Sequence, residues 1–131
     1  FGIRNHYLRF CKNTLLYQSK AGYNYDSTIY GIKNPYKENG IWEFPICIMD
    51  SYVISDSSKN DIKKIKNYTI KQIKDAEKNN IRVFTILFHD YHYTEIFNDY
   101  KIWYEWLIIW LKERFEFIDF KTAVKDNIEY K

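Results

Sequence analysis

The stretch Ile-Arg-Val-Phe-Thr-Ile-Leu-Phe at positions 81–88, followed by His-Asp-Tyr-His at 89–92, decides the fold class that we predict. Eight residues rich in β-branched and aromatic side chains, without Pro or Gly, are typical of a strand buried on both faces. In α/β proteins the chemistry lies just beyond the C-terminal ends of such strands. We therefore expect His89 to be a proton donor, a proton acceptor or a metal ligand. The alternative is a histidine that only caps the strand through a hydrogen bond to a loop.

Length and composition indicate one domain over residues 1–131 with a large core, since the chain is 46% hydrophobic and 20% aromatic. Aromatic residues in this number also suit a cleft that stacks on sugar rings. The net charge of +3 is spread along the chain and does not favour nucleic acid. No apolar run is long enough to span a membrane. The chain begins at Phe1, and Met49 is its single methionine, so we expect a fragment of a longer protein. Of the two cysteines, Cys47 is expected to be a buried thiol.

Hydrophobic periodicity and turn residues predict an alternation of helices and strands. A capping box at 58–61 precedes an amphipathic helix. The order favours an α/β fold with mainly parallel strands. The expected elements are a strand within 1–10, a helix from 14 to 19, a strand within 23–29, a loop over 31–40, a strand over 41–48 interrupted at Pro45, a helix from 62 to 78, a strand over 81–88, a helix from 100 to 114, a strand over 115–120 and a helix over 121–129.

Three polar clusters, at 4–7, 25–28 and 87–90, stand near expected strand ends. Their order resembles the polysaccharide deacetylases, carbohydrate esterase family four. Residues 2–10 are similar to the third motif of that family, 21–28 to its aromatic–Asp–Ser motif, and 87–89 to its Leu-x-His motif, while 41–46 resembles a segment between the last two. The resemblance implies the C-terminal portion of the catalytic domain. The implied fold is part of a distorted (β/α) barrel that lacks its first strands.

The resemblance also implies roles for individual residues. Arg4 would tether and ionise the catalytic base, an aspartate of a motif outside this sequence. Asp26 would hydrogen-bond His89, and His89 would be the general acid that protonates the departing amine. The residues that would contact the sugar or its acetyl group are Tyr25, Tyr30, Leu87 and His6. For His6, an exposed or core-satisfied ring is an equal alternative, and Asp90 is a second candidate to orient His89.

The family holds a divalent metal, usually zinc, through a Phe-Asp-Asp segment and a His-x-x-x-His pair. Neither segment occurs here, because the only histidines are His6, His89 and His92. The spacing of His89 and His92 suits a metal on a helix face and not on a loop that leaves a strand. We therefore expect no metal ligands within this chain.

These observations predict metal-dependent deacetylation of N-acetylated sugars in a polysaccharide. The chain would supply the general-acid half of the site and would be inactive alone. The alternative is a non-catalytic remnant of the same fold that binds glycan or assembles with a partner. Uncovered strand edges would favour pairing with a missing N-terminal half or with a second copy of the chain.

Overall fold

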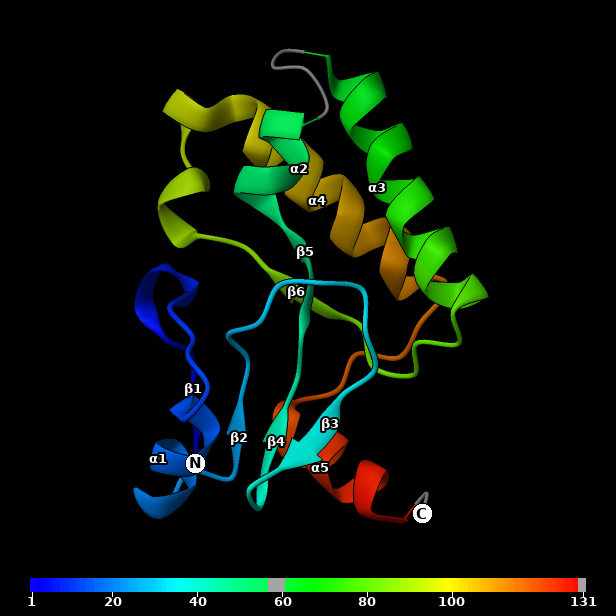
Figure 1. The fold of residues 1–131 in the computed structure, drawn as a ribbon. Helices are drawn as coiled ribbons and strands as arrows, with labels where there is room; N and C mark the ends of the chain where they lie inside the picture. The colour runs from blue at the N-terminus through cyan, green and yellow to red at the C-terminus, as the bar shows by residue number, and fades with distance from the viewer. Residues whose placement is uncertain (57–60, 130–131) are drawn as a thin grey trace. The chain divides into compact units, whose positions relative to one another are not determined.

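The computed structural model describes residues 1–56 and 61–129 (Figure 1). They form a mixed α/β fold whose strands pair mainly in parallel, as predicted. The chain divides into two compact units, which we describe separately. Unit 1 comprises Phe1–Cys47, Asn80–Thr85 and Ile118–Lys131, and unit 2 comprises Ile48–Asn79 and Ile86–Phe117.

Unit 1 contains a four-stranded sheet with the order β1-β2-β4-β3. β2 pairs in parallel with β1 and with β4, whereas β3 is antiparallel to β4. The β3–β4 hairpin turns at Asn39 and Gly40, which both have positive φ, as a two-residue hairpin turn requires. Gly2 is needed in β1 because a Cβ there would collide with the Tyr25 ring of β2. The strands are β1 (Gly2–Ile3), β2 (Tyr25–Asp26), β3 (Tyr36–Glu38) and β4 (Ile41–Glu43).

Two helices and a 3-10 turn complete unit 1: α1 (Thr14–Lys20), α5 (Phe120–Glu129) and η1 (His6–Leu8). An apolar cluster forms where strand and helix side chains meet, and it stabilises the unit by excluding water from large rings. Its members are Trp42, Phe44 and Ala123, with Tyr25, Val83, Phe120 and Val124 packed against them.

Unit 2 is mostly helical (Figure 1). Its elements are α2 (Asp50–Asp56), α3 (Ile62–Lys78), η2 (Asp90–His92), η3 (Glu95–Phe97) and α4 (Asn98–Lys112). α3 packs against α4. Each buries an apolar stripe at helical spacing, formed by Ile65, Thr69, Ile73 and Ala76 on α3 and by Trp103, Leu107 and Leu111 on α4. The Trp103 indole N–H donates to Thr69 Oγ1 at 2.9 Å, which satisfies a buried donor.

β5 (Ile46–Met49) and β6 (Thr85–Leu87) form a separate two-stranded sheet. Every residue of β5 is buried, and both strands lead directly to candidate site residues. Of the strand predicted over 81–88, only β6 is formed, and its residues after Thr85 are only half-buried. β6 pairs with β5 in this two-stranded sheet. Residues 81–84 have high strand propensity, but the β5–β6 ladder does not extend to them.

Several other sequence predictions are confirmed. The helices expected near 14–19, 62–78, 100–114 and 121–129 are α1, α3, α4 and α5. The strand expected over 41–48 is present as β4 and β5, and it breaks at Pro45 as expected for a residue without an N–H. The N-cap of α3 is Asp61, the last residue of the predicted capping box and not its first, and it accepts from the Lys64 amide at 3.1 Å. The rest of the predicted capping box, at 58–60, lies outside the described residues.

Two local predictions are wrong, and one helix was missed. Residues 115–120 form no strand, because Phe115, Phe117 and Ile118 are left exposed and α5 begins at residue 120. The loop expected over 31–40 contains β3, which gains ladder hydrogen bonds from β4. Helix α2 was not expected.

Two further features agree with the sequence. Cys47 is fully buried and Cys11 is exposed, and both are free thiols. Among the described helices, none has the length and apolar character needed to cross a bilayer.

Candidate functional site

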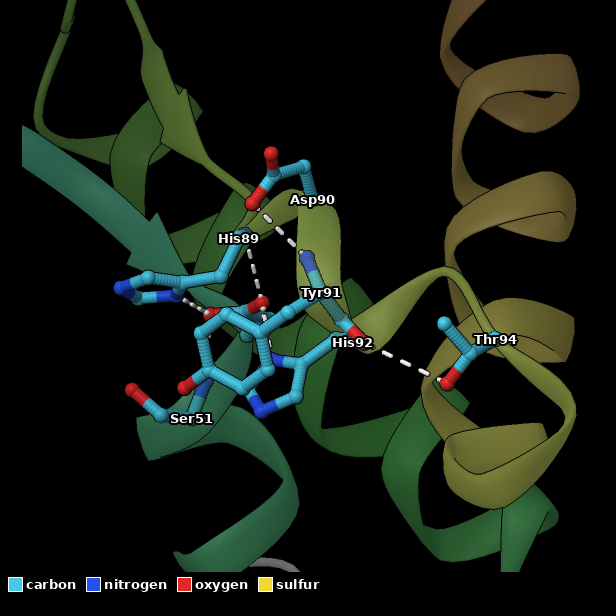
Figure 2. Close-up of polar contacts among 7 residues, drawn as sticks. Ser51, His89, Asp90, Tyr91, His92 and Thr94 are labelled. Carbon is cyan, nitrogen blue, oxygen red and sulfur yellow. Dashed lines mark hydrogen bonds and ion pairs between the residues drawn. The ribbon is translucent and has the colours of Figure 1, made fainter.

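A buried carboxylate in unit 2 holds two imidazole rings. Asp50 follows directly after β5, His89 lies two residues after β6, and His92 ends the η2 turn. His89 Nδ1 lies 2.7 Å from Asp50 Oδ1, and His92 Nδ1 lies 2.7 Å from Asp50 Oδ2. Figure 2 shows both rings with their Nδ1 edges directed to the same place, while the Nε2 atoms point elsewhere. We call Asp50, His89 and His92 the Asp–His–His triad.

Each oxygen of the Asp50 carboxylate accepts two hydrogen bonds. Oδ1 accepts from the Ser51 amide at 2.7 Å in addition to the His89 ring. Oδ2 accepts from the His89 amide at 2.8 Å in addition to the His92 ring. Because a carboxylate only accepts, both rings carry hydrogen on Nδ1. The Nε2 atom of each ring is then the one that can exchange a proton.

The triad is buried unevenly. The side chain of Asp50 is fully buried and that of His92 is 6% exposed, whereas that of His89 is 35% exposed. His89 is therefore the member that solvent or a ligand can reach. Its partly open ring on a buried carboxylate is the arrangement expected of a positioned general acid.

Aromatic rings enclose His92 and border His89. The His92 ring centroid lies 4.0 Å from that of Tyr100 and 5.0 Å from that of Phe97. Burial, followed by the charge of Asp50, raises the pKa of the Tyr100 phenol. Tyr91 contacts both imidazoles, with its centroid 5.5 Å from His89, and remains 55% exposed.

The partner of His89 differs from the two candidates that the sequence offered. The resemblance implies Asp26, but the structure places Asp50 on both the ring and the amide of His89. Asp26 instead accepts from Thr28 Oγ1 at 2.7 Å, and Asp90 accepts from the Tyr91 amide at 2.8 Å. Sequence reasoning missed Asp50, although its position directly after a buried apolar strand was an available signal.

His92 also differs from its expected setting. The segment after β6 was expected to be a loop, but residues 90–92 form a 3-10 turn. That turn brings residues 89 and 92 to the same carboxylate, as i and i+3 positions of a helical turn allow. Two imidazole nitrogens and a carboxylate oxygen, all within 4.8 Å of one another, match the donor set of a divalent metal site.

In unit 1 the predicted arginine lies beside two buried carboxyl groups. Arg4 Nε donates to the Ser27 carbonyl at 2.6 Å, and its Nη2 donates to Ser27 Oγ at 2.9 Å. Burial lowers the pKa of the Arg4 guanidinium, while Asp26 and Glu43 act in the opposite direction. Arg4 and Asp26 are thus brought together in unit 1, and Ser27 is their neighbour.

Asp26 and Glu43 face each other across the parallel pair of β2 and β4. Both side chains are fully buried. Glu43 Oε1 accepts from the Ile29 amide at 2.9 Å, but Asp26 Oδ2 and Glu43 Oε2 have no donor partner within 1–56 and 61–129. Burial raises the pKa of Glu43 to about 8, and the charge of the neighbouring Asp26 adds to the effect. Glu43 is therefore largely protonated at neutral pH, and sequence reasoning did not single it out.

The residues expected to contact sugar have different surroundings. The Tyr25 ring stacks on Phe120 at 4.9 Å in the apolar cluster of unit 1. His6 is exposed and stacks on Tyr7, Tyr30 is 36% exposed, and Leu87 is half-buried at the end of β6. Sugar contact by these four residues stays a prediction, and the contacts of Tyr25 are those of a core residue.

No protein-family model, curated protein or solved structure shows a significant match to this chain. The resemblance to polysaccharide deacetylases therefore depends on the residues quoted above. The Asp–His–His triad is recognised from the structure alone, through the hydrogen bonds of Asp50 to the two rings.

Proposed function

We propose that this chain supplies the general-acid side of a metal-dependent deacetylase acting on N-acetylated sugars in a polysaccharide. The observation that supports it best is the pair of hydrogen bonds between Asp50 and His89. A carboxylate on Nδ1 fixes the ring orientation and leaves Nε2 as the atom that can pass a proton to a substrate. The proton would go to the nitrogen of the departing sugar amine as the bond from that nitrogen to the acetyl carbon breaks.

In this proposal Asp50 takes the orienting role that the resemblance gives to Asp26. Any role of Arg4 and Asp26, which belong to unit 1, stays a prediction. The water nucleophile would be activated by a divalent metal held by the Phe-Asp-Asp and His-x-x-x-His segments, which do not occur among these 131 residues. The 131-residue chain alone would therefore release no acetate from such a substrate. We further propose that the parallel strands belong to a distorted (β/α) barrel, a proposal supported by the parallel β1–β2–β4 pairing.

The test measures acetate release from N-acetylglucosamine oligomers by a protein that contains this chain together with those two segments. We expect His89→Gln to lower kcat by about 100-fold or more, because general acid catalysis contributes about 10²–10⁴. Asp90→Asn is the matched control, since Asp90 bonds the Tyr91 amide and not the His89 ring. Circular dichroism spectra that match the wild type would exclude loss of folding. Full turnover by His89→Gln would refute the proposed role.

A second candidate function is glycan binding without catalysis, and the exposed Tyr91 ring beside His89 favours it. Sugar faces stack on such rings, so N-acetylglucosamine oligomers would bind saturably without added metal and without acetate release. Tyr91→Ala would weaken this binding, whereas Tyr91→Phe would retain it. Absence of saturable binding would exclude this candidate. Sedimentation over a range of concentrations would then test assembly with a second copy.

A further inference from the structure

The Asp–His–His triad has the composition and the spacing of a metal-binding set. Two imidazoles and one carboxylate bind zinc and related divalent ions, with open positions left for water. Their ligand atoms lie within 4.8 Å of one another, and all three side chains belong to unit 2.

We propose that Asp50, His89 and His92 bind one divalent transition-metal ion, with Zn²⁺ the best match to the ligands. On binding, each ring would move its hydrogen from Nδ1 to Nε2 and give the Nδ1 lone pair to the ion. The two N–H···O bonds to Asp50 would be replaced by two N–metal bonds and one O–metal bond. Neutral rings stay neutral in this exchange, so the ligand set keeps a single negative charge.

The surroundings of the triad favour binding because they already hold the ligands in place. The amides of Ser51 and His89 donate to Asp50 and fix its carboxylate independently of the rings. His92 is packed against Tyr100 and Phe97, so little side-chain freedom remains to be lost. The 35% exposure of the His89 side chain provides the route of entry.

Metal binding here goes beyond the proposed deacetylase function and requires no other chain. The ion and the Asp50–His89 hydrogen bond use the same Nδ1 atom, so the two states exclude each other. An ion in the triad would therefore oppose the general-acid role of His89. It is distinct from the water-activating metal that the resemblance implies, whose ligands do not occur in this sequence.

The test titrates Zn²⁺ into the 131-residue chain after treatment with EDTA, using calorimetry, and repeats the titration with Co²⁺ to follow its visible absorption. We expect one ion per chain and the intense absorption of a Co²⁺ ion with four ligands. Asp50→Asn and His92→Gln should each weaken binding by more than about 100-fold, because losing a residue that only supports a ligand already costs about 10–100-fold. The double variant His6→Gln/Cys11→Ser removes exposed donors of unit 1 and should bind as the wild type does.

Imidazole ¹⁵N resonances give a second readout that does not depend on the stability of a variant. Zn²⁺ should shift the Nδ1 resonances of His89 and His92 and leave those of His6 unchanged. The proposal is overturned if millimolar Zn²⁺ gives no saturable binding to the wild-type chain. It is equally overturned if the His6→Gln/Cys11→Ser variant loses binding while Asp50→Asn retains it, or if Zn²⁺ shifts only His6.

Discussion

Asp50→Asn should destabilise unit 2 strongly, although the substitution keeps size and shape. The carboxylate accepts four hydrogen bonds, two at each oxygen. An amide replaces one of these oxygens by an NH₂ donor, which then faces two donors. If the NH₂ takes the place of Oδ2, it faces the His89 amide and the His92 ring. If it takes the place of Oδ1, it faces the Ser51 amide and the His89 ring.

In either orientation one backbone N–H loses its acceptor and one ring must change tautomer or lose its bond as well. Each unsatisfied buried donor costs about 1–3 kcal/mol. The expected loss in free energy of unfolding is therefore about 2–4 kcal/mol. For a chain of this length that corresponds to a melting temperature lower by roughly 10 °C.

The assay is urea and thermal unfolding followed by circular dichroism, in EDTA so that metal binding does not contribute. The matched control is Asp90→Asn, the same chemical change at an exposed carboxylate that accepts from the Tyr91 amide. We expect the control to lose less than about 1 kcal/mol, as exposed substitutions generally do. Equal stability of the two variants would refute the hydrogen-bond account of Asp50.

Other expectations concern both units. Glu43 should make the free energy of unfolding fall as pH rises from about 4.5 to about 8, by at most about 1.4 kcal/mol per pH unit, because native Glu43 keeps its proton until its pKa of about 8 while the unfolded chain loses it near 4.5. Glu43→Gln should flatten this pH dependence in urea titrations. An unchanged slope in that variant would contradict the expectation. Trp103→Phe should lower the free energy of unfolding, measured in urea, by about 2 kcal/mol, because it removes the hydrogen bond to Thr69 and part of the buried ring volume. Unchanged stability would mean that the indole is not buried there. A thiol reagent should modify Cys11 at once in the native chain and Cys47 only after unfolding. Cys47 is buried, and burial raises the pKa of its thiol. Modification of both cysteines at the same rate in the native chain would contradict the packing of β5.

The helices of unit 2 were predictable because their signal is local. The apolar stripe of α3 repeats at three- and four-residue steps, and α4 repeats Trp103, Leu107 and Leu111 at intervals of four. The segment 81–88 shows the opposite case. Its β propensity is high, but only Thr85–Leu87 form a strand, because a strand needs a neighbour that propensity does not supply.

The candidate site was only partly predictable, for a related reason. The position of His89 after a strand was correctly expected from the apolar run before it. Its link to Asp50 joins residues 39 positions apart, and the link from His92 joins residues 42 positions apart. No local pattern encodes such a pairing. The buried Asp26–Glu43 pair likewise results from the register of β2 and β4, which single strands do not reveal.

Asp50 orients His89 and His92 through their Nδ1 atoms. The most direct measurement is the tautomeric state of the three imidazoles by ¹⁵N NMR of EDTA-treated protein, with His6 as the internal reference. We expect His89 and His92 both to carry hydrogen on Nδ1, and we expect Asp50→Asn to change at least one of them without affecting His6. Hydrogen on Nε2 alone in both rings of the wild-type chain would contradict it.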